Sequence, residues 1–307
     1  MKWLRRLFYL VVVLVLIGAP AYYWFIVESH MPSEGSYSID MAEVRKLADS
    51  LPGDKPSEIR VETVAHIHFP KTAVVAGDSW EETDIPVSSY QLVYPDHTAI
   101  IDTAFDEALG KSSGVPLTSY DAEAYKRMSA GLANASLIVI THEHMDHIGG
   151  LIAQPDLAKL LTVTQLTKEQ VENPDRMVPA VWPKGALDGY KPLEYDRYDA
   201  IAPGVVLIKA PGHTPGSQLV YVKRADGTEI LFLGDVAWQR RNIDLVRERA
   251  RLVTQFLIKE DRDAVMLELA EFKRLQDTEP KIEMMPGHDP DALDHFISGN
   301  LLVKGFK

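Results

Sequence analysis

The most informative stretch of this chain is Thr141-His142-Glu143-His144-Met145-Asp146-His147-Ile148-Gly149-Gly150. Residues 135–140, directly before it, are mostly apolar and rich in β-branched side chains, which predicts a buried strand. Residues 151–161, directly after it, predict a helix. Three histidines and one aspartate are therefore expected on a short loop between a buried strand and a helix. Imidazole and carboxylate are the ligands that zinc and similar divalent metals favour, so the stretch predicts metal binding.

The spacing of these side chains fits two adjacent metal ions better than one. His142 and His144 are two residues apart and can point the same way from an extended loop, whereas Asp146 and His147 face a neighbouring point as the chain turns. The alternative is a polar turn with chance histidines, but four ligand-type side chains next to a buried strand are costly to place without a use. The motif His-x-His-x-Asp-His resembles that of the metallo-β-lactamase superfamily, whose members are binuclear metallohydrolases.

Composition excludes several classes of function. The chain has 307 residues, enough for one large domain or two small ones, and its hydrophobic content of 46% supports a sizeable core. The net charge of -12 argues against a nucleic-acid-binding protein and disfavours the nuclease branches of the superfamily. There is no cysteine, so neither a disulfide, a cysteine metal site nor a thiol nucleophile is possible. Composition does not predict the oligomeric state.

The N-terminus predicts one transmembrane helix. Lys2, Arg5 and Arg6 precede 21 uncharged residues, 7–27, which span roughly 31 Å as a helix, about the thickness of one hydrocarbon core. Residues 22–25 are aromatic and would lie at the membrane interface, and the basic residues place the N-terminus in the cytoplasm. The remaining chain is therefore expected on the exported side, in a periplasm or outside the cell.

A cleaved signal peptide is the alternative to an anchor. Ala19-Pro20-Ala21 fits the small-x-small pattern, with cleavage after Ala21 and secretion of the remainder. The mature chain would then begin with the strongly apolar residues 22–27, which favours the uncleaved anchor. We expect an anchor in residues 1–28, a linker with a short helix in residues 29–59, and a hydrolase domain in residues 60–307.

Three further ligand-type residues follow predicted strands at turns that contain glycine. His213 lies in Pro-Gly-His-Thr-Pro-Gly, Asp235 follows Leu-Phe-Leu-Gly, and His288 lies in Met-Pro-Gly-His-Asp. Each is weak taken alone, because a single histidine after a glycine is usually an ordinary loop residue. Together with the first motif, and in this order, they strengthen the resemblance, which covers about residues 60 to 300. It implies an αββα sandwich, an α/β fold in which two sheets lie between outer helices and the metals lie at a sheet edge.

The resemblance also implies a role for each residue. One metal ion would be held by His142, His144 and His213, and the second by Asp146, His147 and His288. Asp235 resembles the bridging carboxylate, and Asp102 resembles an early strand-end aspartate that supports the site without binding metal. Zinc is the favoured metal, with iron or manganese as alternatives. Two cations close together lower the pKa of a shared water and supply hydroxide to attack a carbonyl ester, and Asp146 would carry the proton to the leaving group.

Asp235 and the ending Pro-Gly-His-Asp resemble the quorum-quenching lactonases most. True β-lactamases of the superfamily lack this bridging aspartate, whereas glyoxalase-II-like thioesterases keep it but have a basic glutathione-binding region that this chain lacks. The expected substrate is therefore a small molecule with a carbonyl ester, such as an acyl-homoserine lactone, with a thioester as the alternative. A non-hydrolytic scaffold, sensor or iron-dependent oxidoreductase is the rival class.

One residue departs from the lactonase pattern. The lactonases place a tyrosine three residues after the bridging aspartate, and this chain has Trp238 there. An indole N–H donates a hydrogen bond but cannot act as a phenol does. Trp238 is expected either to line the substrate pocket against an acyl chain or to be a packed aromatic residue at the start of a helix.

Overall fold

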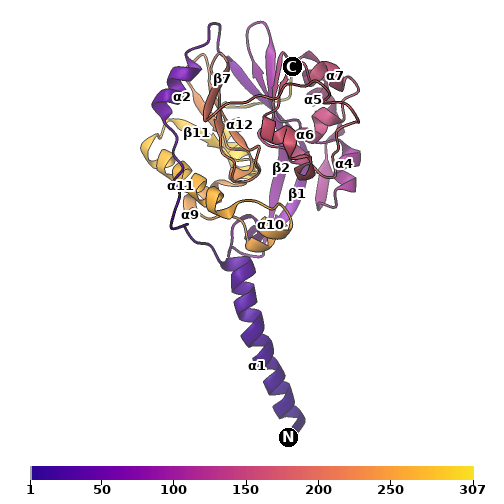
Figure 1. The fold of residues 1–307 in the computed structure, drawn as a ribbon, viewed down its shortest axis with the longest axis vertical. Helices are drawn as coiled ribbons and strands as arrows, with labels where there is room; N and C mark the ends of the chain where they lie inside the picture. Colours follow the sequence, from indigo (N-terminus) through magenta and orange to yellow (C-terminus); the bar gives the residue numbers. More distant parts are fainter. Residues whose placement is uncertain (1) are drawn as a thin grey trace.

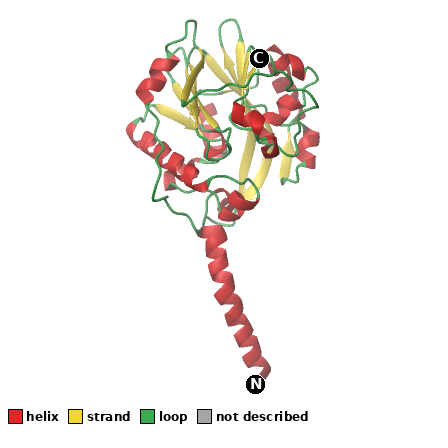
Figure 2. Ribbon diagram, in the orientation of Figure 1, coloured by secondary structure: helices red, strands yellow, loops and turns green. Residues whose placement is uncertain are grey.

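Two β-sheets pack face to face between outer helices in the computed structural model, which describes residues 2–307 (Figures 1 and 2). The first sheet has the order β12-β1-β2-β3-β5-β6, with β4 paired to β1, and the second has the order β11-β10-β9-β8-β7. The strands of the first sheet are β1 (Glu58–Pro70), β2 (Glu82–Val93), β3 (Thr98–Ile101), β4 (Leu117–Tyr120), β5 (Leu137–Val139), β6 (Thr164–Gln165) and β12 (Val303–Lys304). Those of the second are β7 (Tyr198–Ala202), β8 (Val205–Lys209), β9 (Gln218–Lys223), β10 (Glu229–Phe232) and β11 (Ile282–Met285).

Helices cover the outer face of each sheet (Figure 2). The helices between β1 and β7 in the chain are α3 (Lys71–Val74), α4 (Glu107–Ser112), α5 (Ala122–Asn134), α6 (Met145–Ile152), α7 (Leu157–Leu160), α8 (Lys168–Glu172) and the 3₁₀ turn η2 (Pro174–Arg176). Those of the second half are the 3₁₀ turn η3 (Gly234–Val236), α9 (Arg240–Leu245), α10 (Arg251–Phe256), α11 (Arg262–Thr278) and α12 (Pro290–Ser298).

The strand β8 shows why both faces of the second sheet are buried. Val205 and Leu207 point into the core between the sheets, and Val206 and Ile208 point into the core under α11. Successive side chains of a strand face opposite sides, so a strand covered on both sides becomes a continuous apolar run. This run explains why the sequence shows no polar alternation at this strand.

Residues 29–59 contribute to the hydrophobic core between the second sheet and α11. The short helix expected within this segment is α2 (Met41–Ala48). It is capped by Asp40, whose carboxylate accepts hydrogen bonds from two backbone N–H groups. Met41, Val44 and Ala48 are buried in the same core as Val206 and Ile208. The segment is thus packed on the second sheet, and the division of the chain at residues 28 and 59 stays a prediction.

The single helix expected over residues 151–161 is two short helices, α6 and α7, with a turn between them, and the first begins earlier than predicted. Helix α6 starts at Met145 and ends at Ile152, so Asp146 and His147 lie in its first turn rather than on a loop. Gly149 and Gly150, which were placed before the helix, lie inside α6. Gly150 permits close packing there, since a Cβ atom on it would lie 1.9 Å from the carbonyl oxygen of Thr103.

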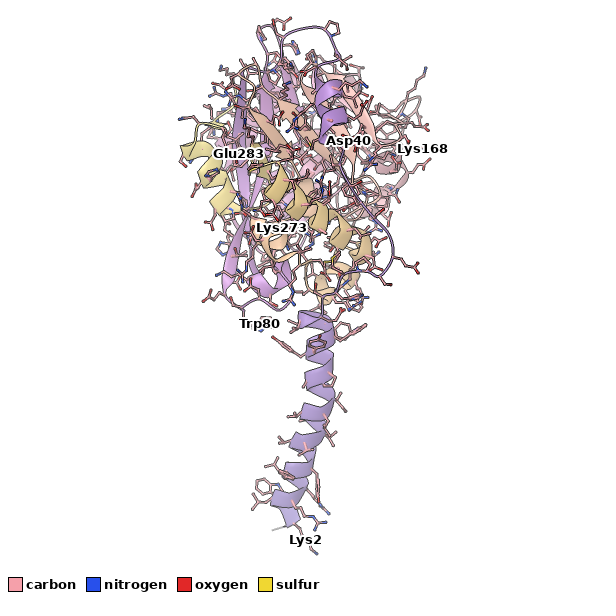
Figure 3. The ribbon with its side chains drawn as sticks, turned by 90° about the vertical axis from the view of Figure 1, so that its left-hand side faces the viewer. Lys2, Asp40, Trp80, Lys168, Lys273 and Glu283 are labelled. Carbon is pink, nitrogen blue, oxygen red and sulfur yellow. The ribbon has the colours of Figure 1, made fainter. Side chains whose placement is uncertain are left out.

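One apolar helix projects from the domain at its N-terminus. Helix α1 (Lys2–Tyr22) continues into a π-helical turn, η1 (Tyr23–Val27), and none of the α1 side chains is buried (Figures 1 and 3). The helical segment Lys2–Val27 is long enough to cross a membrane, and an 18-residue stretch of it has a mean hydropathy of 2.3. A signal sequence meets the same criteria.

Candidate metal centre

Four strands bring their carboxyl ends to one edge of the sandwich. β3 runs parallel to β5 in the first sheet, and β10 runs parallel to β11 in the second. Because parallel neighbours end at the same edge, the residues that follow them come together. The ligand-type residues that follow these strands are Asp102 after β3, His142 after β5, Asp235 after β10 and His288 after β11.

Two groups of ligand-type side chains meet at this edge and share one carboxylate. Within each group, one ligand atom per residue lies within 4.8 Å of all the others. The first group is His142, His144, His213 and Asp235, and the second is Asp146, His147, Asp235 and His288. The structure therefore brings together all seven residues that were predicted as ligands, and Asp102 belongs to neither group.

Asp235 lies at the centre of four imidazoles. Its carboxylate oxygens are 3.0 Å and 3.2 Å from the Nε2 atoms of His288 and His147, and 3.5 Å and 3.7 Å from those of His213 and His142. Burial raises the pKa of Asp235, but the surrounding histidines outweigh it and hold the pKa well below its usual value. The group is an anion that faces both halves of the cluster.

Burial also keeps three of the histidines neutral. It lowers the pKa of His142 and of His144 well below the usual value, and it lowers that of His213. A neutral imidazole is the form that binds a metal. His147 and His288 behave differently. Burial lowers the pKa of each, but the nearby carboxylates together outweigh it and raise the pKa: Asp235, Asp102 and Asp146 for His147, and Asp235 and Asp146 for His288.

Three buried atoms at the centre make no hydrogen bond of normal geometry with the described residues: His142 Nε2, His147 Nε2 and Asp235 Oδ1. Asp235 Oδ1 lies close to His147 and His288, but the contacts are not aligned as hydrogen bonds. Buried polar atoms are nearly always paired, since an unpaired one costs about 1–3 kcal/mol. These atoms belong to ligand-type side chains, and they converge on one small volume. The donor set and its unpaired atoms therefore fit divalent cations.

The outer nitrogens of three rings are held by acceptors. Asp102 Oδ2 lies 2.8 Å from His147 Nδ1, Glu260 Oε2 lies 3.0 Å from His213 Nδ1, and the carbonyl oxygen of Pro86 lies 2.9 Å from His288 Nδ1. An acceptor on Nδ1 fixes the tautomer and turns Nε2 toward the centre. Asp102 also accepts hydrogen bonds from the Thr141 N–H and hydroxyl, so it ties the first motif to β3.

Glu260 and its partner Arg249 were missed in the sequence. Both side chains are almost fully buried, and they form an ion pair behind His213. Burial raises the pKa of Glu260, but Arg249 and His213 outweigh it, so the pKa lies below its usual value and the carboxylate stays charged. No local pattern marks Glu260, because it meets His213 from 47 positions away in the chain.

A match to one protein family over most of the domain identifies the family of this chain. The profile of the family described as "Metallo-beta-lactamase superfamily" matches residues 83–303. The chain belongs to this superfamily. The predicted α/β metallo-β-lactamase fold and the predicted resemblance to lactonases are confirmed.

Its similar relatives include bacterial lactonases. An N-acyl homoserine lactonase of a Bacillus species is 24% identical over 181 residues, which cover 53% of this chain and 69% of that protein. The N-acyl homoserine lactonase AiiA of Bacillus thuringiensis subsp. kurstaki is 23% identical over 175 residues, which cover 52% of this chain and 68% of that protein. This superfamily member is thus a metal-dependent hydrolase related to acyl-homoserine lactonases.

Solved structures share the fold. An N-acyl homoserine lactone hydrolase with the product N-hexanoyl-L-homoserine bound at its catalytic metal centre has a TM-score of 0.60 at 17% identity, covering 78% of this chain and 96% of that one. AidC, a dizinc quorum-quenching lactonase, has a TM-score of 0.52 at 16% identity, covering 77% of this chain and 89% of that one.

An apolar pocket of about 520 Å³ opens onto the metal centre of this superfamily member. Its floor is formed by His144, Asp146, Asp235 and His288. Its walls are mostly apolar, and they include Ile67, Phe69, Ile85, Val115, Val178, Trp238, Leu257 and Ile258. A larger hollow of about 630 Å³ lies elsewhere, is lined largely by charged side chains and contains none of the clustered residues.

Trp238 is both a pocket-lining residue and a packed aromatic residue, the two alternatives predicted for it. It lines the pocket, yet only 6% of its surface is exposed. Its indole N–H donates a hydrogen bond of 2.7 Å to Asp235 Oδ2, a contact that was not predicted. The Arg249 guanidinium lies 4.9 Å from the centre of its ring. Trp238 therefore links the pocket wall to the shared carboxylate.

A buried acid beside the His213 turn gives a prediction for stability. Glu268 Oε1 accepts a hydrogen bond from the Gly212 N–H, and burial raises the pKa of Glu268 from 4.5 to about 8. In the unfolded chain this carboxyl ionises near pH 4.5, so its contribution to folding is present below that pH and is lost as the pH rises to about 8. We expect Glu268→Gln to unfold at a higher temperature than wild type at pH 8, and at nearly the same temperature near pH 4.5.

Thermal unfolding across this pH range checks the expectation. Glu123→Gln, at an exposed position in α5, is the control and should show no such trend. A difference between Glu268→Gln and wild type that does not change with pH would contradict the assignment.

Proposed function

We propose that this chain is a membrane-anchored, exported binuclear metallohydrolase that opens lactone rings, with acyl-homoserine lactones as its substrate class. One observation carries the proposal: Asp235 is shared by two ligand clusters at the floor of an apolar pocket. The similarity to N-acyl homoserine lactonases supports the substrate class.

The seven clustered residues are proposed to hold two ions. The first would be held by His142, His144 and His213, the second by Asp146, His147 and His288, and Asp235 would bridge them. Zinc is the favoured metal, and iron and manganese are the alternatives. Divalent ions supply Lewis acidity toward a carbonyl oxygen and acidify water near neutral pH.

Asp146 is the proposed proton carrier. Its side chain is 18% exposed, whereas that of Asp235 is 3% exposed, so Asp146 is the more accessible of the two carboxylates that line the pocket. Opening a lactone leaves an alkoxide that must gain a proton, and a carboxyl group next to the reacting atoms supplies one. Trp238 would hold Asp235 through its N–H and cover the acyl chain with its ring.

Asp102 and Glu260 are proposed to position ligands without touching metal or substrate. Asp102 would fix the ring of His147, and Glu260 that of His213. Losing such a partner typically lowers metal affinity or activity by about 10–100-fold.

Substrate preference tests the proposed reaction. We expect the zinc-loaded full-length protein to release acid from an acyl-homoserine lactone, followed by pH-stat, and to release little from a thioester with the same acyl chain. The Asp235→Asn variant serves as the blank. Turnover of the thioester alone would replace the lactonase proposal by a glyoxalase-II-like thioesterase.

The N-terminal helix is proposed to anchor the enzyme. Residues 1–28 would form the anchor, residues 29–59 would connect it, and residues 60–307 would form the hydrolase domain on the exported side. The alternative is a secreted enzyme cleaved after Ala21. The intact mass of the mature protein distinguishes the two, because an anchored chain keeps residues 2–21 and a secreted chain lacks them.

A further inference from the structure

The helix α1 is joined to the domain by a well-packed junction. The Gly77 N–H donates a hydrogen bond of 2.8 Å to the carbonyl oxygen of Ile26, which is buried. The side chain of Glu28 is 11% exposed, and its carboxylate forms ion pairs with Arg251 and Arg262. These contacts fix the direction in which α1 leaves the domain, because the turn cannot rotate without breaking them.

Aromatic contacts surround the same junction. The Arg251 guanidinium lies 4.0 Å from the ring centre of Trp24, and the Trp80 N–H donates a hydrogen bond of 3.2 Å to the Tyr22 hydroxyl. The rings of Phe25 and Phe256 are 6.0 Å apart. Figure 3 shows Trp80 beside the upper end of α1. Tryptophan and tyrosine are enriched where a chain crosses the membrane interface.

Large apolar side chains are exposed on the face from which α1 emerges. Leu252 and Phe256, one helical turn apart on α10, are 49% and 67% exposed, and Leu257 is 59% exposed. Trp80 is 60% exposed on the other side of the junction. In Figure 1, α10 lies directly beside the upper end of α1. We call Trp80, Leu252, Phe256 and Leu257 the basal face.

The basal face is continuous with the pocket mouth. Leu257 and Ile258 follow α10 in the chain and line the pocket that ends at Asp235. Val178, which is 64% exposed, lines the same pocket. An apolar path therefore connects the basal face with the floor of the pocket.

We propose that the basal face rests on the surface of the phospholipid bilayer that holds α1, so that the pocket takes acylated substrates from the lipid. The proposal rests on the anchor described under the proposed function. A helix that crosses the bilayer and leaves the domain in a fixed direction brings this face to the headgroups. Contact there removes the exposed apolar side chains from water, and such interfacial burial reaches about 5–10 Å below the headgroups.

The absence of cysteine permits a direct test on the full-length chain. Single cysteines at Leu252 or Phe256 would carry an environment-sensitive fluorophore, with Leu14→Cys in α1 as the positive control. Lys168→Cys is the negative control, because Figure 3 shows Lys168 far from α1. Each protein would be reconstituted in vesicles of phosphatidylethanolamine and phosphatidylglycerol, with and without a spin-labelled phosphatidylcholine. The spin label would stand near the top of the acyl chain, and for Leu14→Cys near the end of that chain, because residue 14 is in the middle part of the uncharged segment 7–27.

We expect the spin-labelled lipid to quench the fluorophore at positions 252 and 256, as for side chains at the headgroup boundary, and to leave position 168 unchanged. Quenching at position 14 but at neither basal position would overturn the proposal and leave the anchor standing. Basal positions shielded from aqueous iodide but not quenched by lipid would overturn it in favour of a second copy of the chain. No quenching at position 14 would overturn both the anchor and the docking.

Discussion

Replacing Asp235 by asparagine is expected to lower the metal content from about two ions per chain to one or none, and to lower lactone turnover by roughly a thousandfold. The carboxylate lies between 3.0 Å and 3.7 Å from the Nε2 atoms of four histidines, and it is the only residue common to both clusters. Asparagine keeps the size of the side chain but removes its negative charge. Metal ions supply several kcal/mol of transition-state stabilisation, which corresponds to this loss of rate.

Elemental analysis of the purified variant and its turnover would be measured together. Asp226→Asn, in the exposed turn between β9 and β10, is the matched control and should keep both values. An Asp235→Asn protein with full metal content and full turnover would show that Asp235 does not bridge.

Replacing Glu260 by glutamine is expected to lower both the melting temperature and the metal affinity. Arg249 is fully buried, and its charge would lose its anionic partner. An unpaired buried charge costs about 3–5 kcal/mol, which corresponds to a fall in Tm of about 10 °C. His213 would also lose the carboxylate on Nδ1, and we expect zinc to bind about 10–100-fold more weakly.

A double variant separates the two effects. Arg249→Met combined with Glu260→Gln removes both charges, so it should recover most of the melting temperature but not the metal affinity. Asp277→Asn breaks an exposed pair with Lys273 and should change Tm little. If Glu260→Gln melts at the wild-type temperature and binds zinc as tightly, the support of His213 by Glu260 is disproved.

The sequence made the candidate site predictable because its parts are local. His142, His144, Asp146 and His147 stand in one short motif, and His213, Asp235 and His288 each follow a strand. The ends of parallel strands meet at one edge of each sheet, and the face-to-face packing of the two sheets brings these edges together.

Other features depend on contacts between distant parts of the chain. Glu260 reaches His213 because the segment between α10 and α11 folds back over the site, and no pattern around Glu260 marks this. The close approach of Gly150 in α6 to the carbonyl oxygen of Thr103 is a contact that only the folded chain defines. The hydrogen bond from Trp238 to Asp235 likewise depends on the turn η3 between them.

The most direct measurement is the turnover of an acyl-homoserine lactone by the metal-free, full-length protein as zinc is added stepwise. We predict that ring-opening, followed by mass spectrometry of the product, rises until about two equivalents of zinc are bound and then stays constant. The series would be repeated with iron(II) and manganese(II). Two bound ions of each metal with no ring-opened product would contradict the assignment of this site as a binuclear lactonase.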